Sequence, residues 1–549
     1  MDMVTRVMAS AKGAKSATEA ATQAAGKLAR TVQQNVKRAV AGTLGLSGER
    51  MTKVDTAWLR MDCDANLMMI IGVWQLKPGV KYAAVCERIE NTLLRYDRFR
   101  QRVLEDAGGA TWVEDRNFDL RNHVLLEKLP KVGMGHQQEA LQDRVAELAT
   151  ERLNAKRPLW QIHLIEDYTG PDGVKGSAMI VRIHHCIADG IALISVTMSL
   201  VDGGVAPPEP VAKSASSKSA TESAVHSAED WITDTLLKPF TDISVKALGA
   251  MGDGAARSLG LLGDPEGMKD GIEKGFQKGI SGSIDMARVL YQLASDSAAL
   301  ALMPDDSKTR LKGKPGGKKK VAWCQPIPLE DVKAVGKALN CSINDVLLSC
   351  VAGALGEYLK SLGDDVTGQE IRAMVPVNLR PSDQGNDQTN QAQKLGNRFG
   401  LAPLVLPIGL ENPIERVYEV RKRMRALKGS YQPLLAFSLL AVAGLLIKPA
   451  QDMMLNLFAR KTTAVMTNVP GPRDKLKFCG ATLEQSMFWV PQSGDVGLGV
   501  SILSYGGGVQ FGVITDSLLC PEPQRIIDEF LPEFARLSIV TLMLPWGDD

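Results

Sequence analysis

The chain has 549 residues, of which 45% are hydrophobic and 23% are charged, and its formal net charge is +2. This length exceeds one ordinary hydrophobic core, so at least two structural units are expected. The nearly neutral charge argues against a general nucleic-acid binder. Eight scattered cysteines without a CxxC pair favour reduced thiols over a disulfide framework.

Membrane-related segments are the next class to consider. The first thirty residues lack the apolar stretch of a secretory signal. The longest apolar run, residues 434–447, has 14 residues, whereas a spanning helix needs about 20. This run therefore predicts a buried core helix, with a membrane-facing substrate entrance as the alternative.

Residues 1–48 form a basic, alanine-rich N-terminal extension. Leu28, Val32, Val36 and Val40 recur at helical spacing, which makes only a thin apolar stripe. This pattern favours a weakly helical extension over a basic amphipathic helix that contacts anionic lipid.

Residues 49–202 predict a first α/β domain. Strand-like runs at 67–76 and 177–183 alternate with helical patterns at 81–95 and 137–153.

Residues 203–320 predict a linker and helical connection with a basic end. The connection begins with a composition typical of linkers. It ends at residues 307–320, "SKTRLKGKPGGKKK", which hold seven Lys or Arg and no acid. We expect a solvated basic loop there, with docking of a phosphate-bearing ligand as the alternative.

Residues 321–549 predict a second α/β domain. A helix is expected within 341–363, capped by Ser342 or Asn344. Strands are expected at 371–380 and 463–472, and a glycine-turned β-hairpin at 495–516.

The sequence "HHCIADG" holds the strongest candidate for chemistry: His184, His185, Asp189 and Gly190. Adjacent side chains on a strand point to opposite faces, so one histidine can enter a cavity while the other packs behind it. An imidazole titrating near pH 6.5 suits a general base, and a nearby acid can fix its geometry. A purely structural pair is the alternative.

Two other chemistries are disfavoured. Zinc binding is disfavoured because adjacent strand residues diverge and the other histidines lack HxH or HExxH spacing. A serine hydrolase is disfavoured because no G-x-S-x-G sequence is present.

The motif "HHCIADG" resembles the HHxxxDG motif of the CoA-dependent acyltransferase superfamily, which includes chloramphenicol acetyltransferase and peptide-synthetase condensation domains. Further pieces resemble the bacterial wax ester synthase/diacylglycerol acyltransferase family, in family order from about Met51 to beyond Asp516. They are "MTKVDTAWL", "FDLRNHV", "PLW", "NDVLLS", "PVNLR", "GNRFG", "TNVPGP" and "SYGGG". The chain departs from the family pattern in "NLMMIIGVW", where relatives often carry Pro-Met-His, and in Ser349, where alanine is common.

The resemblance implies an α/β, two-domain fold like that of chloramphenicol acetyltransferase. Mixed β-sheets flanked by helices would enclose an active-site tunnel between the domains. It also implies an acyl-CoA-dependent O-acyltransferase that esterifies long-chain fatty alcohols, diacylglycerol or both. His185 would be the general base that takes the alcohol proton. His184 and Asp189 would be largely structural, and Gly190 would permit a tight turn.

Four residues are candidates for stabilising the oxyanion or shaping the site: Asn468, Asn344, Asp345 and Asn397. Asn468 is favoured as the donor, while Asn344 and Asp345 are expected to shape the site. The alternatives are a helix cap for Asn344, a turn residue for Asn397 and a backbone brace for Asn468.

The sequence "PLW", Pro158, Leu159 and Trp160, is the candidate substrate channel, with ordinary core packing as the alternative.

The expected partners are acyl-CoA as co-substrate, a fatty alcohol or diacylglycerol, and a peripheral membrane or lipid-droplet surface. No cofactor, metal or nucleic acid is expected. The expected location is cytoplasmic, at the inner membrane face or on lipid inclusions. The alternative functions are a condensation-type acyltransferase with a carrier-bound acyl donor and a non-catalytic lipid-binding relative.

Overall fold

The computed structural model describes residues 48–544 with several gaps. The residues left out within that span are 107–108, 131–132, 134–135, 209–302, 380–394, 429, 431, 434–435, 437–439, 441–450 and 452–458. The predictions for the 1–48 extension, for most of the 203–320 connection and for nearly all of the 434–447 run therefore lie outside the described residues.

The first sheet has six strands in the order β13-β14-β2-β7-β6-β5. Their bounds are β13 Lys477–Phe478, β14 Ala481–Trp489, β2 Met69–Lys77, β7 Lys175–His184, β6 Trp160–Thr169 and β5 Val124–Glu127. β2 and β7 pair antiparallel, with Met69 opposite His184. The central strand β7 thus delivers the two histidines at its end, as predicted.

The second sheet has seven strands, six of them in the order β11-β10-β12-β15-β16-β8, while β9 also pairs with β16. Their bounds are β11 Phe399–Leu406, β10 Ile371–Asn378, β12 Ala464–Pro470, β15 Leu498–Tyr505, β16 Gly508–Asp516, β8 Lys319–Trp323 and β9 Ile327–Pro328. The predicted hairpin is β15–β16, and its turn residues Gly506 and Gly507 have φ of 58° and 80°. These left-handed values favour glycine.

The described fold also has a three-stranded sheet, three short 3-10 helices and eight α-helices with defined bounds. The small sheet has the order β1-β4-β3, with bounds β1 Glu49–Arg50, β4 Gly109–Glu114 and β3 Gln101–Asp106. The helices are α2 Lys53–Arg60, α3 Tyr82–Asn91, α4 Gln137–Leu148, α5 Gly190–Leu200, α11 Leu329–Ala338, α12 Ile343–Ser361, α14 Pro413–Lys428 and α17 Pro523–Leu542. The helix predicted at 81–95 is shorter in the structure. It ends at Asn91, and short 3-10 turns follow it.

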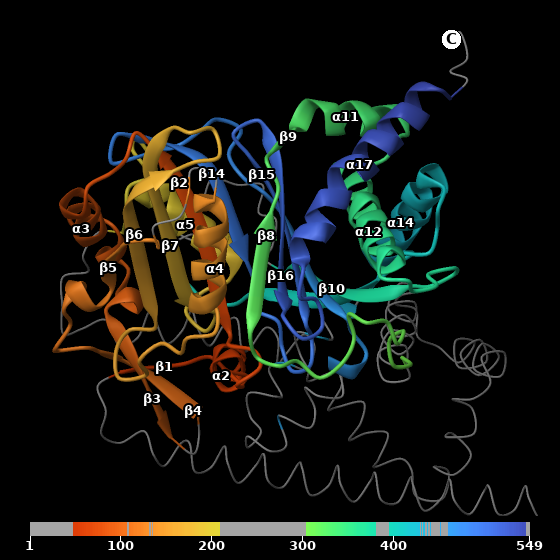
Figure 1. The fold of residues 1–549 in the computed structure, drawn as a ribbon. Helices are drawn as coiled ribbons and strands as arrows, with labels where there is room; N and C mark the ends of the chain where they lie inside the picture. The colour runs from red at the N-terminus through yellow and green to blue at the C-terminus, as the bar shows by residue number, and fades with distance from the viewer. Residues whose placement is uncertain are drawn as a thin grey trace, which may run out of the picture. The chain divides into compact units, whose positions relative to one another are not determined.

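Helix α12 lies in the core of the second half, beside α14 and α17 (Figure 1). Ser342 caps it through a capping box with Asp345, so the alternative cap Asn344 is wrong. No single described helix has the length and apolar composition of a membrane span. Helices α11 and α12 are long and apolar enough only when they are counted together, and a bend of 100° separates them.

The two halves of the chain share the first sheet. Strand β14, from the second half, pairs antiparallel with β2 and lies beside it in Figure 1. Across this pair, the buried Gln75 Nε2 donates to Gln485 Oε1 at 2.9 Å. The result is the mixed α/β, two-domain architecture that was predicted, with one strand exchanged into the neighbouring sheet. The exact domain boundaries stay predictions.

The basic segment 307–320 is only partly a solvated loop. Lys312 Nζ donates to the backbone carbonyls of Ala459 and Thr462. Lys319, which begins β8, is buried and donates to Gln492 Oε1 at 2.9 Å. The prediction of a solvated loop is therefore wrong for these two lysines, whose charged ends satisfy buried acceptors instead.

Candidate active site

His184 is held by backbone and carboxylate contacts at the end of β7. Its ring is buried; Nδ1 accepts a hydrogen bond from the Cys186 N–H at 3.2 Å, and Nε2 lies 3.4 Å from Asp62 Oδ1. Because Nδ1 accepts, the ring proton sits on Nε2, facing the carboxylate. These contacts agree with the predicted supporting role of His184.

His185 follows the strand and is buried against aromatic rings. Its ring stacks on that of Trp58, with centroids 4.3 Å apart and planes 12° apart, and the Phe399 ring lies 5.5 Å away. Burial lowers the pKa of His185 from 6.5 to about 4. At neutral pH the imidazole is therefore uncharged, which is the protonation state a general base needs.

Asp189 joins the histidine loop to a segment from the second half of the chain. Its Oδ1 accepts from the Ala192 N–H at 3.0 Å and caps α5, while Oδ2 accepts from the Arg398 N–H at 2.9 Å. The largely structural role predicted for Asp189 matches these contacts. Its negative charge also raises the pKa of His185, against the larger effect of burial.

Gly190 does not permit a tight turn, and that prediction is wrong. Gly190 is the first residue of α5, and its φ is not left-handed. A Cβ built on it meets no atom within 4 Å. Neither the backbone conformation nor the space around it therefore requires glycine there.

Asn397 is the candidate amide that lies beside His185. Its Nδ2 donates to the His185 carbonyl oxygen at 2.8 Å and to Asp55 Oδ1 at 2.7 Å. Its backbone N–H donates to the same Asp55 oxygen at 3.1 Å. Asp55 is buried, and burial raises its pKa from 3.8 to about 6.

Asn344 and Asn468 meet elsewhere, in a cavity of about 450 Å³ in the second half of the chain. Asn468 Nδ2 donates to Asn344 Oδ1 at 2.8 Å. The other lining residues are Leu348, Val375, Pro376, Val377, Asn378, Leu379, Met424, Leu427, Lys428, Ser430, Pro433 and Met466. No residue of the histidine motif lines this cavity, so the oxyanion role of Asn468 stays a prediction. Asp345 serves the helix cap.

Pro158, Leu159 and Trp160 do not line that cavity either. Trp160 is buried and its Nε1 donates to the Phe99 carbonyl at 2.8 Å. The Leu159 carbonyl accepts from the His184 N–H at 3.0 Å. These contacts correspond to the core-packing alternative and support the end of β7, while a channel role stays a prediction.

Four side chains around the histidines were not singled out from the sequence: Asp55, Trp58, Asp62 and Phe399. The first two belong to "MTKVDTAWL", where an acid and a tryptophan three residues apart share a helix face. That spacing is a weak signal. Among the described residues, no group of three or more His, Cys, Asp or Glu is placed to hold a metal ion.

Family models match most of the chain. The wax ester synthase/diacylglycerol acyltransferase catalytic domain matches residues 51–347, and the C-terminal domain of the same family matches residues 395–538. Together with the mixed α/β fold and the buried histidine, these matches define an acyltransferase. The chain belongs to the wax ester synthase/diacylglycerol acyltransferase family.

Individual relatives agree with this assignment. The Mycobacterium tuberculosis (strain ATCC 25618 / H37Rv) protein named "Probable diacyglycerol O-acyltransferase tgs1" is 26% identical over 89% of this chain and 96% of its own length. Arabidopsis thaliana wax ester synthase/diacylglycerol acyltransferase 4 is 22% identical over 85% of each chain.

Solved structures share the fold. The wax ester synthase/diacylglycerol acyltransferase from Marinobacter aquaeolei VT8 has a TM-score of 0.59 at 19% identity, covering 90% of this chain and 99% of its own. The first condensation domain of the calcium-dependent antibiotic synthetase has a TM-score of 0.52 at 14% identity, covering 90% and 96%.

Proposed function

We propose that this acyltransferase uses acyl-CoA to esterify long-chain fatty alcohols, diacylglycerol or both, giving wax esters, triacylglycerol or both. The observation that carries the proposal is His185, a buried imidazole whose pKa is lowered to about 4 by burial and which stacks on Trp58. The family assignment supports acyl-CoA and an acyl acceptor as the substrates.

The proposed reaction balances through one proton. His185 removes the proton of the alcohol hydroxyl while the alcohol oxygen bonds to the thioester carbonyl carbon. The tetrahedral intermediate collapses with cleavage of the carbon–sulfur bond, and the departing CoA sulfur takes the proton from His185. The products are an ester and free CoA thiol, and His185 returns to its neutral form.

The cavity in the second half is the proposed site for an aliphatic chain. Its volume of about 450 Å³ lies within the range of about 300–1,000 Å³ that is typical of small-molecule sites. Nine apolar side chains line it: Leu348, Val375, Pro376, Val377, Leu379, Met424, Leu427, Pro433 and Met466. Each methylene removed from water contributes about 0.8 kcal/mol, so a long chain gains most from such a lining.

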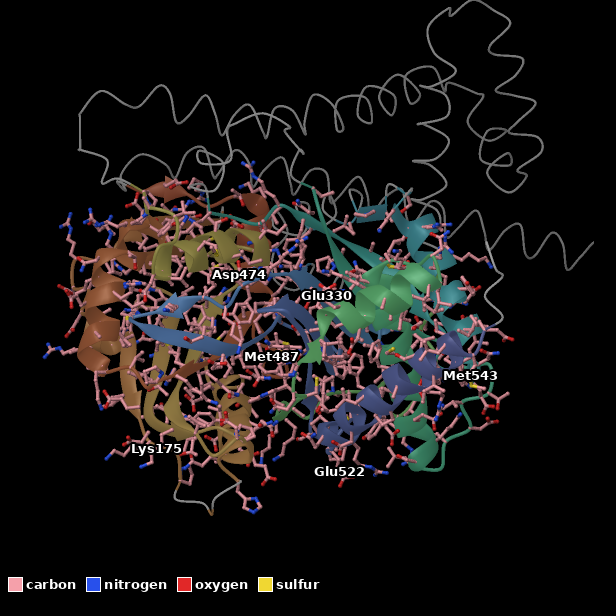
Figure 2. All side chains as sticks on the ribbon, turned by 90° about the horizontal axis from the view of Figure 1, so that it is seen from above. Lys175, Glu330, Asp474, Met487, Glu522 and Met543 are labelled. Atoms are coloured by element: carbon pink, nitrogen blue, oxygen red, sulfur yellow. The ribbon has the colours of Figure 1, made fainter. Side chains whose placement is uncertain are left out.

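The proposed location is the cytoplasm, with peripheral attachment to the inner membrane face or to lipid inclusions. Water-insoluble substrates support this proposal, because a lipid surface concentrates them. Large apolar side chains are also exposed at the end of α17: Ile539, Leu542 and Met543 are 57%, 80% and 78% exposed. Figure 2 shows Met543 at the opposite end of that helix from Glu522.

The decisive experiment is thiol release from palmitoyl-CoA, with hexadecanol or dioleoylglycerol as acceptor. We expect acceptor-dependent release by the wild type and a loss of about 10² to 10⁴-fold in His185→Ala. His136→Ala is the matched control, because His136 is exposed and its ring pairs with the exposed Glu139 rather than with any residue of the histidine motif.

The outcomes separate the alternatives. No release from folded wild-type protein with either acceptor would favour a lipid-binding relative. Release only with a carrier-bound acyl donor would favour a condensation-type enzyme. Full activity in His185→Ala would refute the assignment of the base.

A further inference from the structure

The orientation of the Asn397 side chain is dictated by its neighbours. Its NH₂ group lies between the Asp55 carboxylate and the His185 carbonyl, at 2.7 and 2.8 Å. An ionised carboxylate and a backbone carbonyl can only accept hydrogen bonds. The NH₂ group must therefore face them, and the amide oxygen Oδ1 must point elsewhere.

Sixteen buried side-chain atoms in the described part of the chain lack a hydrogen-bond partner, and two of them belong to this site: Oδ1 of Asn397 and Nδ1 of His185. Burial lowers the pKa of His185, while hydrogen bonding to the backbone of His185 itself and, to a smaller extent, to the Asn397 side chain raises it. The Asp189 carboxylate raises the pKa of the same ring, and the neighbouring His184 lowers it. The two atoms without a partner belong to residues that already touch, because Asn397 Nδ2 donates to the His185 carbonyl oxygen at 2.8 Å.

Asp55 controls where that amide sits. Its Oδ1 accepts from both the side chain and the backbone N–H of Asn397. The neighbouring Gly396 has a φ of +142°, which favours glycine, whereas a Cβ there would lie 3.6 Å from Asp55 Oδ2, an ordinary van der Waals distance. Three residues along α2, Trp58 stacks on the His185 ring. One short helix therefore holds both the ring and the amide beside it.

We propose that Asp55 is a positioning residue for His185 that acts through Asn397. By holding the Asn397 amide, Asp55 aims the amide oxygen at Nδ1–H of His185, which keeps Nε2 as the proton-accepting nitrogen. This inference rests on the proposed function, because it assigns a role in presenting the base. The role of Asp55 is to accept hydrogen bonds, so an uncharged acceptor can replace it.

The first test compares two substitutions at Asp55. Asp55→Ala removes the acceptor, and we expect kcat to fall about 10 to 100-fold with KM within about two-fold of the wild type. Asp55→Asn keeps an acceptor oxygen, and we expect kcat within about three-fold. Equal losses in both variants, or no loss in Asp55→Ala, would overturn the proposal.

A second test exchanges the two side chains. Asn397→Asp sets two carboxylates against each other and should abolish most of the activity. Adding Asp55→Asn restores a donor and an acceptor between the two positions, although not the donor to the His185 carbonyl, and we expect the double variant to regain at least about ten-fold over Asn397→Asp. A double variant no faster than Asn397→Asp would contradict direct contact between the two positions.

A third test needs no turnover, so it separates this inference from the proposed function. In protein with isotope-labelled histidines, the ring ¹⁵N shifts report the tautomer of each of the six histidines. His185→Ala assigns the His185 signal. We expect the Nδ1–H tautomer in the wild type and in Asp55→Asn, and a tautomer mixture in Asp55→Ala.

Asp516→Ala is the matched control for that measurement. Asp516 is likewise a buried carboxylate, and it accepts from the Gly316 and Gly317 N–H groups at 2.9 Å each. Its loss should leave the His185 tautomer unchanged. An unchanged tautomer in Asp55→Ala as well would overturn the positioning role, even if that variant were inactive.

Discussion

Asp55 and His185 are buried in contact with the same amide, and their pKa values are displaced in opposite directions. Burial raises the pKa of Asp55 from 3.8 to about 6 and lowers that of His185 from 6.5 to about 4. At about 1.4 kcal/mol per pKa unit, each displacement corresponds to about 3 kcal/mol in the free energy of unfolding.

The two contributions have opposite signs as the pH falls. The unfolded chain protonates His185 near pH 6.5, whereas the folded protein does so only near pH 4, so acidification across this window favours unfolding. The folded protein protonates Asp55 near pH 6, whereas the unfolded chain does so only near pH 3.8, so acidification favours folding. In the wild type the two effects nearly cancel.

Single substitutions should expose each contribution, measured as urea midpoints or melting temperatures between pH 4 and 7. Relative to the wild type, Asp55→Asn should lose about 3 kcal/mol of stability as the pH falls from 6.5 to 4. His185→Gln should gain about 3 kcal/mol over the same range. If the differences in stability from the wild type do not vary with pH, the opposite pKa displacements of Asp55 and His185 are refuted.

Three further predictions follow from the site. Gly190→Ala should stabilise the protein by about 0.5–1 kcal/mol in thermal melts, because alanine is the better helix residue and a Cβ meets no atom; a lower melting temperature would contradict this. His184→Ala should cost about 1–3 kcal/mol by leaving the Cys186 N–H unsatisfied, whereas His184→Asn, with an acceptor oxygen, should recover part of that cost in the same melts. Met424→Trp should shift the preferred acyl-CoA to a shorter chain by reducing the cavity volume, and an unchanged chain-length profile would exclude this cavity as the acyl site.

Patterns confined to neighbouring residues could be predicted from the sequence. The β15–β16 hairpin, helix α12 and the position of His184 and His185 at a strand end all depend on local periodicity and turn residues. Gly190 shows the limit of this reasoning. A glycine after an aspartate suggests a turn, yet here it opens a helix with ordinary backbone angles.

Contacts between distant parts of the chain could not be predicted in this way. Asp55 and Asn397 are 342 positions apart, and nothing in either local pattern specifies the other. The same holds for strand β14, whose alternating burial suits either sheet. The sequence therefore indicated the base but not the helix that holds it, because helix α2 reaches His185 only through the tertiary fold.

The shared sheet has a consequence for how the chain reaches its native state during synthesis. Gln75 and Gln485, which pair across β2 and β14, are 410 positions apart. At a synthesis rate of about 5–20 residues per second, the open edge of β2 waits roughly 20 to 80 seconds for its partner. An unpaired edge of mostly buried apolar residues can template pairing with another chain. Slow translation should therefore expose nascent chains to aggregation until β14 emerges, and a transcript that ends before β14 should leave the edge of β2 open.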